Sequence, residues 1–303
     1  MWKINVFAGS PLDRAGHRRA DPAWLAARLT DPASRFVPVW RARNLVTVGD
    51  PAAAVRLDGA AAAVLIADGA SAVFLGLDGG AAHFALDLSH FEEDRVRALA
   101  GVAEPLDLWA IGGTLPRDEA ALLAHARALV TWHQRHRFCG VCGAPTEPRE
   151  AGHVRACTDP ACAALHFPRT DPAVIMLVTF GERCLLGRQK SWADPIYSTL
   201  AGFVEPGESL EEAVAREVME EVGVPLSEVV YHSSQPWPFP LSMMIGFTAV
   251  AATDHLVIDG VEIADARWLT RADIRNHAAL GFRLPRPHSI ARHLIEDWLR
   301  ADR

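Results

Sequence analysis

The chain has 303 residues, of which 50% are hydrophobic, so it can bury more than one core. Its net charge of −7 and pI near 6.0 argue against a surface built to coat nucleic acid. No apolar run reaches membrane-spanning length, and the N-terminus lacks the basic-then-apolar pattern of a signal peptide. We therefore expect a cytoplasmic protein with no membrane partner.

Residues 1–130 have the pattern of a separate α+β domain. Short apolar segments separated by turn residues predict a meander of strands at 61–67, 72–77 and 82–88. A helix is expected at 92–100, and a long alanine- and leucine-rich helix at 118–135 leads out of the domain. No functional residue can be assigned here from the sequence, and a scaffold or dimerisation role is our hypothesis.

Residues 131–169 contain the end of that helix and four of the five cysteines. Cys139 and Cys142 form a C-x2-C pair with a glycine after each sulfur, and a second pair follows at Cys157 and Cys162. This pattern is typical of a zinc ribbon. Four thiolates fill a tetrahedral Zn²⁺ and leave no open position, so we expect a single structural zinc ion. The alternative, two buried or disulfide-bonded pairs, fits a reducing compartment less well.

Residues 170–303 form a third region that mixes strand and helix patterns. An unbroken apolar run at 173–180 predicts a strand buried on both faces, with Arg183–Gln189 as its hairpin partner. Residues 197–201 lead into a loop at Gly202, and further strands are expected at 229–232 and 244–252. Helices are expected at 271–276 and 289–300.

A loop marked by glycine and proline begins at Gly202 and leads into another helix. This helix starts after Ser209 and ends at Gly223, where a glycine is favoured. Its first half carries an apolar stripe. At about 100° per residue, the stripe continues as three carboxylates in the second half. These are Glu217, Glu220 and Glu221.

Like charges at these spacings repel, and no basic residue follows at i+4 to relieve them. A solvated acidic face would place the acids opposite the apolar stripe, which is not the case. Clustered carboxylates on a rigid helix suit Mg²⁺ or Mn²⁺. Arg216 lies off the stripe, so we expect it to hold Glu208 and Glu212 without neutralising the metal face.

The same segment resembles the Nudix box, G-x5-E-x7-R-E-U-x-E-E-x-G-U with U apolar, at every fixed position. The resemblance implies an α/β/α sandwich that hydrolyses a nucleoside diphosphate linked to another group, using divalent metals. The expected fold class is therefore α/β: a Nudix sandwich preceded by a four-cysteine zinc ribbon and an N-terminal α+β domain.

A proline-rich segment, SQPWPFPLS, follows between two predicted strands. Its alternating prolines predict a stiff, extended loop. The segment is similar to the SQPWPFPxS signature of the NADH pyrophosphatases, also described as NAD-capped RNA hydrolases, which share the zinc ribbon. The resemblance implies that the loop forms part of a mononucleotide pocket. Its residues are Gln235, Pro236, Trp237, Pro238, Phe239, Pro240, Leu241 and Ser242.

The resemblance also implies roles for single residues. Phe203 matches an aromatic that stacks on nicotinamide, and Phe167 matches one offered by the neighbouring subunit of a homodimer. Glu262 matches an additional metal ligand or base. The Met244 backbone and Ala291 complete the mononucleotide pocket. The backbone carbonyl of Ala201 is a further metal ligand.

Together these features imply hydrolysis of NAD(H) to nicotinamide mononucleotide and AMP, with NAD-capped RNA as a further substrate. About two or three Mg²⁺ or Mn²⁺ ions would act at each site. Glu221 and Glu262 both stay open as the base. A Nudix enzyme for ADP-ribose or diadenosine polyphosphates is the alternative within the class. A non-catalytic zinc-ribbon regulator that binds nucleotides or nucleic acid is the alternative outside it.

Overall fold

The computed structural model describes residues 3–101, 103–192, 195–258 and 260–301. These residues form two compact units. The C-terminal unit contains Asp171–Pro236, the residues from Ser242 onward, and the N-terminal segment up to Val6. The N-terminal unit contains Phe7–Thr170 together with Trp237–Leu241. The proline-rich loop therefore groups with the N-terminal unit although both flanking strands belong to the C-terminal one.

A mixed sheet forms the centre of the C-terminal unit. Its strand order is β13-β14-β10-β11-β15, and β12 also pairs with β10. β10 runs parallel to β14 and antiparallel to β11 and β12, which confirms the predicted hairpin. The strands are β10 (Asp171–Phe180), β11 (Arg183–Gln189), β12 (Leu200–Phe203), β13 (Leu226–Trp237), β14 (Ser242–Ala251) and β15 (Ile263–Thr270).

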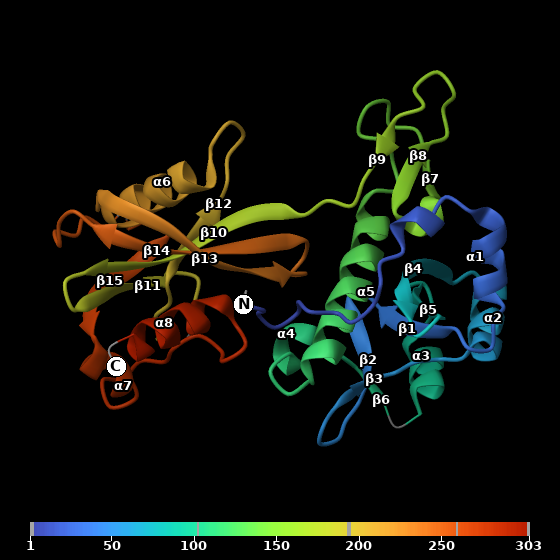
Figure 1. Ribbon diagram of the computed structural model, residues 1–303, viewed down its shortest axis with the longest axis horizontal. Helices are drawn as coiled ribbons and strands as arrows, with labels where there is room; N and C mark the ends of the chain where they lie inside the picture. The colour runs from blue at the N-terminus through green and yellow to red at the C-terminus, as the bar shows by residue number, and fades with distance from the viewer. Residues whose placement is uncertain (1–2, 102, 193–194, 259, 302–303) are drawn as a thin grey trace. The chain divides into compact units, whose positions relative to one another are not determined.

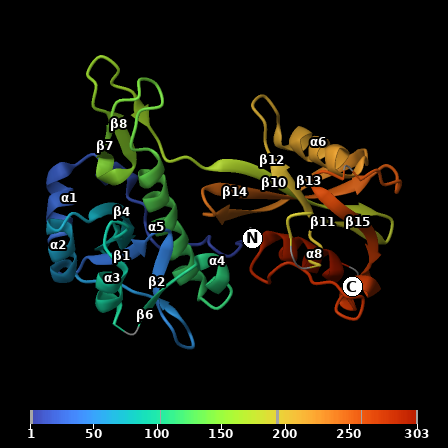
Figure 2. The same ribbon diagram turned by 180° about the vertical axis from the view of Figure 1, so that it is seen from behind.

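Helices cover both faces of this sheet (Figures 1 and 2). Val174 and Met176 of β10 point to the core under α6 (Leu210–Val222). Ile175 and Leu177 point to the opposite core, under α7 (Arg271–Arg275) and α8 (Ile290–Arg300). Because alternate residues of one strand enter two different cores, the strand reads as a continuous apolar run. The α/β/α sandwich is confirmed.

The start and end of α6 follow from its sequence. The Ser209 side chain accepts from the Glu212 N–H, and the Glu212 carboxylate accepts from the Ser209 N–H, which makes a capping box. At the other end Gly223 has φ 68°, the left-handed conformation that glycine adopts without strain. Both ends lie where the sequence predicts them.

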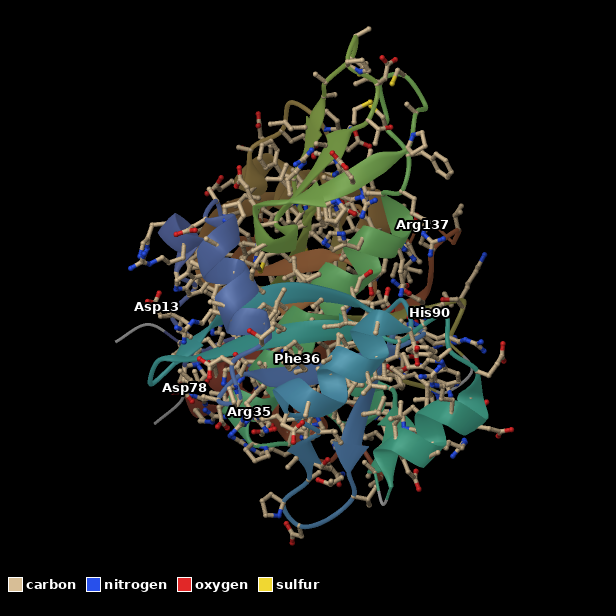
Figure 3. All side chains as sticks on the ribbon, turned by 90° about the vertical axis from the view of Figure 1, so that its right-hand side faces the viewer. Asp13, Arg35, Phe36, Asp78, His90 and Arg137 are labelled. Atoms are coloured by element: carbon tan, nitrogen blue, oxygen red, sulfur yellow. The ribbon has the colours of Figure 1, made fainter. Side chains whose placement is uncertain are left out.

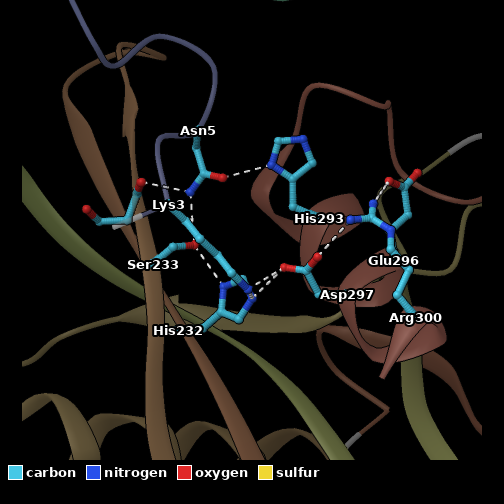
Figure 4. A network of polar contacts seen from close by, with 9 residues as sticks. Lys3, Asn5, His232, Ser233, His293, Glu296, Asp297 and Arg300 are labelled. Atoms are coloured by element: carbon cyan, nitrogen blue, oxygen red, sulfur yellow. Dashed lines mark hydrogen bonds and ion pairs between the residues drawn. The ribbon is translucent and has the colours of Figure 1, made fainter. Parts of the chain in front are cut away.

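The N-terminal segment is fastened to the C-terminal unit by a polar network (Figure 4). Lys3 Nζ lies 2.6 Å from Asp297 Oδ2 on α8 and 2.8 Å from His232 on β13. Asn5 donates to Ser233 Oγ and to the Ser234 carbonyl, at 3.0 and 2.8 Å. These bonds explain why the N-terminal segment belongs to the C-terminal unit.

The N-terminal unit has its own mixed sheet, in the order β3-β2-β1-β5-β4, with β6 paired to β2. Phe36 of β1, labelled in Figure 3, is fully buried and stacks on Phe84 of β5 with ring centroids 5.0 Å apart. The strands are β1 (Arg35–Trp40), β2 (Arg43–Thr47), β3 (Ala53–Ala54), β4 (Ser71–Asp78), β5 (Ala81–Asp87) and β6 (Ala103–Leu106). The helices are η1 (Gly16–Arg18), α1 (Pro22–Leu29), α2 (Gly59–Ala67), α3 (Glu93–Ala100), α4 (Leu108–Ile111) and α5 (Arg117–Arg135).

The predicted strand at 61–67 is wrong, because this segment belongs to helix α2. Asp58 caps the helix by accepting from the Ala61 N–H at 2.8 Å. A short alanine-rich apolar run has no periodicity that separates strand from helix, and alanine is the strongest helix former. The strands expected at 72–77 and 82–88 and the helices at 92–100 and 118–135 are present as β4, β5, α3 and α5.

The cysteine-bearing segment folds as a small three-stranded antiparallel sheet. Its strands are β7 (Thr146–Arg149), β8 (Val154–Cys157) and β9 (Leu165–His166), with the turn η2 (Glu150–Gly152) between the first two. In the part of the chain that the structure describes, no helix is both long and apolar enough to span a membrane.

Gln235 holds three backbone segments of the C-terminal unit together. Its fully buried amide donates to the Val6 and His288 carbonyls, at 3.1 and 2.8 Å, and accepts from the Ile290 N–H at 2.8 Å. The side chain is thus fully used in joining the N-terminal segment, β13 and the start of α8.

Gln235→Met should lower the free energy of unfolding by about 2–4 kcal/mol, because it leaves three buried backbone groups without this partner. Denaturant unfolding measures the change. Ser227→Ala, at an exposed position of the same strand, is the control and should change stability by less than about 0.5 kcal/mol. Wild-type stability in the methionine variant would contradict this role.

Candidate functional site

The three box carboxylates occupy different environments on α6. Glu221 is buried, with 4% of its surface exposed, and Glu217 is half-buried. Glu220 is exposed, because it lies about 100° around the helix from Glu221. The expectation that all three continue the inward face is therefore correct for Glu217 and Glu221 and wrong for Glu220.

Glu217 packs directly on the backbone of Gly202. A Cβ at Gly202 would lie 1.8 Å from Glu217 Cδ and 1.9 Å from Oε1, far inside contact distance. Only glycine fits under this carboxylate. Gly202 itself lies in β12, paired with Val174 of β10, and not in the loop where we expected it. The glycine thus fixes the distance between the central sheet and the acidic helix.

Arg216 contacts more of the acidic residues than expected. Its guanidinium binds Glu208 at 2.5 and 3.0 Å, as predicted, but does not bind Glu212, which is used in the capping box. It also lies 2.9 Å from Glu217 and 2.9 Å from Glu220. The expectation that Arg216 does not neutralise the carboxylates of the metal face is therefore wrong. A guanidinium is long enough to reach Glu208 and, with its other nitrogen, the start of the carboxylate cluster.

The pKa of Glu217 responds to the charges around it, including that of Glu262. Burial raises the pKa of Glu217, the Arg216 guanidinium lowers it, and the negative charges of Glu220 and Glu262 raise it again. Glu262 lies immediately before β15 and accepts a hydrogen bond at its backbone carbonyl from the Lys190 N–H at 3.0 Å. The role that the resemblance implies for Glu262, as a metal ligand or base, stays a prediction.

The carboxylates suit hard divalent ions, since they combine several ionisable oxygens with mutual repulsion that a cation would relieve. Among the described residues, however, their oxygens are not drawn together into a group within 4.8 Å. An ion here would need further oxygens from substrate or water, which is usual for Mg²⁺. The residues therefore fit an open metal site and not a closed cage.

The opposite face of β12 carries the groups expected to bind a nucleotide. Leu200 packs under α6, whereas Ala201 packs on the α8 side of the sheet. Because side chains alternate along a strand, Phe203 points to the α8 side as well. Met244 and Ala291 belong to the same α8-side core. Phe203 and Met244 both pair with Ala173, so they share one row of the sheet.

Phe203 has 60% of its surface exposed at the end of this row. An exposed phenylalanine ring offers a flat apolar surface for a planar ring. Phe167, in the N-terminal unit, is likewise 65% exposed. The structure places both rings at the surface of their own units.

The proline-rich segment differs from the expected extended loop. Ser234–Trp237 forms the end of β13, at the edge of the sheet, where proline is tolerated. Trp237 and Phe239 enter an aromatic cluster with Phe7 and Trp109, with ring centroids 4.9–6.5 Å apart. Sequence reasoning did not find Trp109, because no motif surrounds it.

The four cysteines of the ribbon lie together. Their sulfurs are all within 4.8 Å of one another, with Cys139 and Cys162 3.8 Å apart and Cys142 and Cys157 3.4 Å apart. Zinc–sulfur bonds of about 2.3 Å require sulfurs about 3.8 Å apart in a tetrahedron, so the set fits Zn²⁺. The free thiols show no disulfide.

The cysteines of the ribbon differ in acidity. N–H groups of Cys142 and Val141 point at Cys139 and lower its pKa to about 6, whereas burial raises the pKa of Cys157 to about 12. His166 Nε2 lies 3.3 Å from the Cys139 sulfur. We expect His166 to support this ligand from outside the metal's coordination sphere.

Three family models match the chain. They are a NUDIX domain over residues 169–291, the NADH pyrophosphatase zinc ribbon domain over 134–167, and an NADH pyrophosphatase-like rudimentary NUDIX domain over 33–132. The sandwich and its carboxylate helix thus define the class, a Nudix hydrolase. The rudimentary domain was not recognised from the sequence, where it appeared only as α+β.

Curated relatives narrow the class. The "NAD-capped RNA hydrolase NUDT12" proteins of Macaca fascicularis and Homo sapiens are 34% and 33% identical to this chain, over 98% of it and 73% of each relative. The "NAD-capped RNA hydrolase NudC" of Stutzerimonas stutzeri is 49% identical over 60% of this chain and 63% of the relative. The chain belongs to the zinc-ribbon Nudix family of NADH pyrophosphatases and NAD-capped RNA hydrolases.

Purified protein should carry one zinc ion per chain, and Cys142→Ser should lose it and unfold at lower temperature, because zinc binding is coupled to folding. Metal analysis and thermal unfolding measure both effects. Cys184→Ser is the control, since Cys184 lies in the core of the C-terminal unit and should leave the zinc content unchanged. A stable, zinc-free wild-type protein would refute the ribbon.

Proposed function

We propose that this enzyme hydrolyses the pyrophosphate bond of NAD(H) to nicotinamide mononucleotide and AMP, and that the same cut removes a 5′ NAD cap from RNA. The arrangement around β12 supports this best. Gly202 lies beneath the Glu217 carboxylate, and Phe203, the next residue, turns to the face that carries Met244 and Ala291. A diphosphate and its attached base could thus be held by neighbouring residues of one strand. The names of the relatives support the choice of substrate.

Mg²⁺ or Mn²⁺, about two or three ions per site, would be held by Glu217, Glu220, Glu221 and the Ala201 carbonyl, with Glu262 as a further ligand. When bound, these ions supply positive charge to the diphosphate and lower the pKa of the attacking water. When metal binds, Arg216 would lose its contacts with Glu217 and Glu220 and keep those with Glu208. Its three hydrogen bonds, two to Glu208 and one to the Phe203 carbonyl, would still hold the guanidinium in place.

The protein's own groups then orient the reaction. Glu221 or Glu262 would position the water or accept its proton. Glu221 is buried and held by the helix, whereas Glu262 is exposed, so the two differ in rigidity more than in chemistry. Phe203 would stack on the nicotinamide and fix the diphosphate against the carboxylates.

The second ring, Phe167, would come from the neighbouring subunit of a homodimer. Its exposure in the chain, beside the exposed Leu165, supports an apolar contact with another molecule. A cytoplasmic location completes the proposal and is supported by the free, clustered thiols of the ribbon.

Glu221→Gln should fold normally but lose at least about a hundredfold in kcat, since it removes a charge that acts at the transition state. Chelation should abolish wild-type activity, and Mg²⁺ or Mn²⁺ should restore it. Glu228→Gln, an exposed residue of β13, is the matched control and should keep full activity. A fully active glutamine variant at 221 would refute the mechanism, and no turnover of any dinucleotide by wild-type protein would support a non-catalytic regulator.

Phe203→Ala and Phe167→Ala should each lower kcat/KM for NADH roughly five- to tenfold, because each removes about 1 kcal/mol of stacking. ADP-ribose lacks the nicotinamide and should be affected far less. Kinetics on both substrates measure the difference. Equal losses would show that the rings support the fold instead.

Mixing the two alanine variants tests the homodimer separately. If Phe167 crosses to the neighbouring site, one site of each mixed dimer regains both rings, so part of the NADH activity should return after subunit exchange. No recovery would place Phe167 at its own subunit's site.

A further inference from the structure

A pocket of about 660 Å³ lies within the N-terminal unit, between its sheet and the zinc ribbon. Its lining comes from the start of β4, the end of β5 and helix α5, and from the ribbon strands β7 and β8. Sites for small molecules have volumes of about 300–1,000 Å³. None of the lining residues is a ribbon cysteine or belongs to the proposed catalytic site. The lining includes Asp87, His133, Arg137, Phe138, Thr146 and Arg155.

Arg155, on β8, is a buried cation with no carboxylate partner. Only 9% of its surface is exposed. Its guanidinium donates to the hydroxyl and the carbonyl of Thr146, at 2.7 and 2.6 Å, and to His133 Nδ1 at 2.9 Å. The His133 ring donates from Nε2 to the Gly152 carbonyl at 2.7 Å, so it is neutral. Every acceptor of Arg155 is therefore uncharged, whereas a buried arginine is normally paired with an acid.

The other charges of the pocket do not balance Arg155. Burial, and then the positive charge of Arg137, lower the pKa of Arg155. The Arg137 side chain is exposed (Figure 3) and forms no ion pair or hydrogen bond with any residue that the structure describes. Asp87 accepts from the Gln134 amide at 3.2 Å and from the Ser89 N–H at 2.9 Å, and lies beyond ion-pair distance of either arginine.

An anion in this pocket would relieve the repulsion between the two guanidinium groups. It would also accept from the N–H groups of Arg155 that remain, since only three of the five donors of this side chain are used. Paired guanidinium groups bind phosphate well, because several charge-assisted hydrogen bonds form at once. The pocket therefore suits a ligand that carries a phosphate.

An aromatic ring lines the same pocket. Phe138 directly follows Arg137 and has 67% of its surface exposed. Its backbone forms a β-bridge with Pro145, and the next residue, Cys139, donates from its N–H to the Ala144 carbonyl at 2.7 Å. Because Cys139 is one of the four ribbon cysteines, the ribbon fixes the position of this ring. A flat exposed ring beside a phosphate-binding group suits a nucleobase.

We propose that this pocket binds a mononucleotide, with its phosphate at Arg155 and Arg137 and its base on Phe138. The site goes beyond the proposed hydrolysis and does not depend on it, because every residue that forms it belongs to the N-terminal unit. A polyanion without a ring would also bind the two arginines, but the exposed phenylalanine favours a ligand with a planar base.

Calorimetric titration of the full-length, zinc-loaded protein with AMP, without added Mg²⁺ or Mn²⁺, tests the proposal. Wild-type protein should bind AMP, and Arg137→Ala should raise the Kd roughly five- to tenfold by removing a charge-assisted contact to phosphate. Phe138→Ala should raise it about fivefold by removing the stacking surface. Arg135→Ala is the matched control, because Arg135 is exposed two residues earlier but does not line this pocket. It should keep the Kd within about twofold.

Arg155→Gln removes the buried charge and should raise the Kd for AMP at least about tenfold. Zinc content and thermal unfolding show whether this variant is folded, and the two exposed variants decide the question if it is not. Inorganic phosphate should bind more weakly than AMP but with the same dependence on Arg137, and adenosine should bind without that dependence. Phosphate binding as tight as that of AMP would overturn the nucleotide in favour of a simple anion site.

Phe203→Ala separates this site from the proposed catalytic one, which can also take a nucleotide. The binding that depends on Arg137 should persist in this variant within about twofold. AMP binding that is lost in Phe203→Ala but unchanged in Arg137→Ala would overturn the pocket and leave the proposed hydrolysis standing. If NADH is not hydrolysed but AMP binding depends on Arg137, the proposed function fails and the pocket stands. Equal losses in Arg135→Ala and Arg137→Ala, or no binding of AMP, would overturn the pocket.

Discussion

The site depends on the close packing of the Glu217 carboxylate against the backbone of Gly202. This contact places an acidic helix on a central strand with no side chain between them. The contact is held in place because β12 pairs with β10, the strand buried on both faces. Its even residues face the carboxylates, and its odd residues face the α8 side. Four consecutive residues therefore reach both faces of the sheet, as the proposed dinucleotide site requires.

The sequence predicted the C-terminal unit well because its signals are local. The capping box, the glycine at the end of α6 and the apolar run of β10 each act within a few residues, and all are found where expected. The contacts of Arg216 with Glu217 and Glu220 could not be predicted in the same way. They depend on which rotamer a long side chain adopts among several acids at similar distances.

The N-terminal unit was the least predictable part for a physical reason. A rudimentary Nudix domain has no carboxylate helix, so its sequence contains no long motif, and its parallel β1–β5 pairing joins segments far apart in the chain. The strand predicted within helix α2 is wrong because an alanine-rich run of nine residues carries no usable periodicity. The proline-rich loop carried a motif, but its partners Phe7 and Trp109 come from segments that carry none.

The zinc ribbon and the carboxylate helix differ in whether they need a metal ion to fold. The ribbon has three short strands and four sulfurs around one point, so we expect zinc to hold its cysteine-bearing turns together. Its η2 turn is held separately, since His153 bonds to the Phe74 carbonyl at 2.7 Å. The carboxylate helix has a cation of its own. The Glu208 carboxylate, followed by those of Glu217 and Glu220, raises the pKa of Arg216 above its usual value, and burial opposes this only in part. Since Arg216 relieves the repulsion among these acids, the helix can fold without a divalent ion. In the proposed site, a divalent ion would take the place of the Arg216 guanidinium at Glu217 and Glu220, and substrate oxygens would complete its ligands.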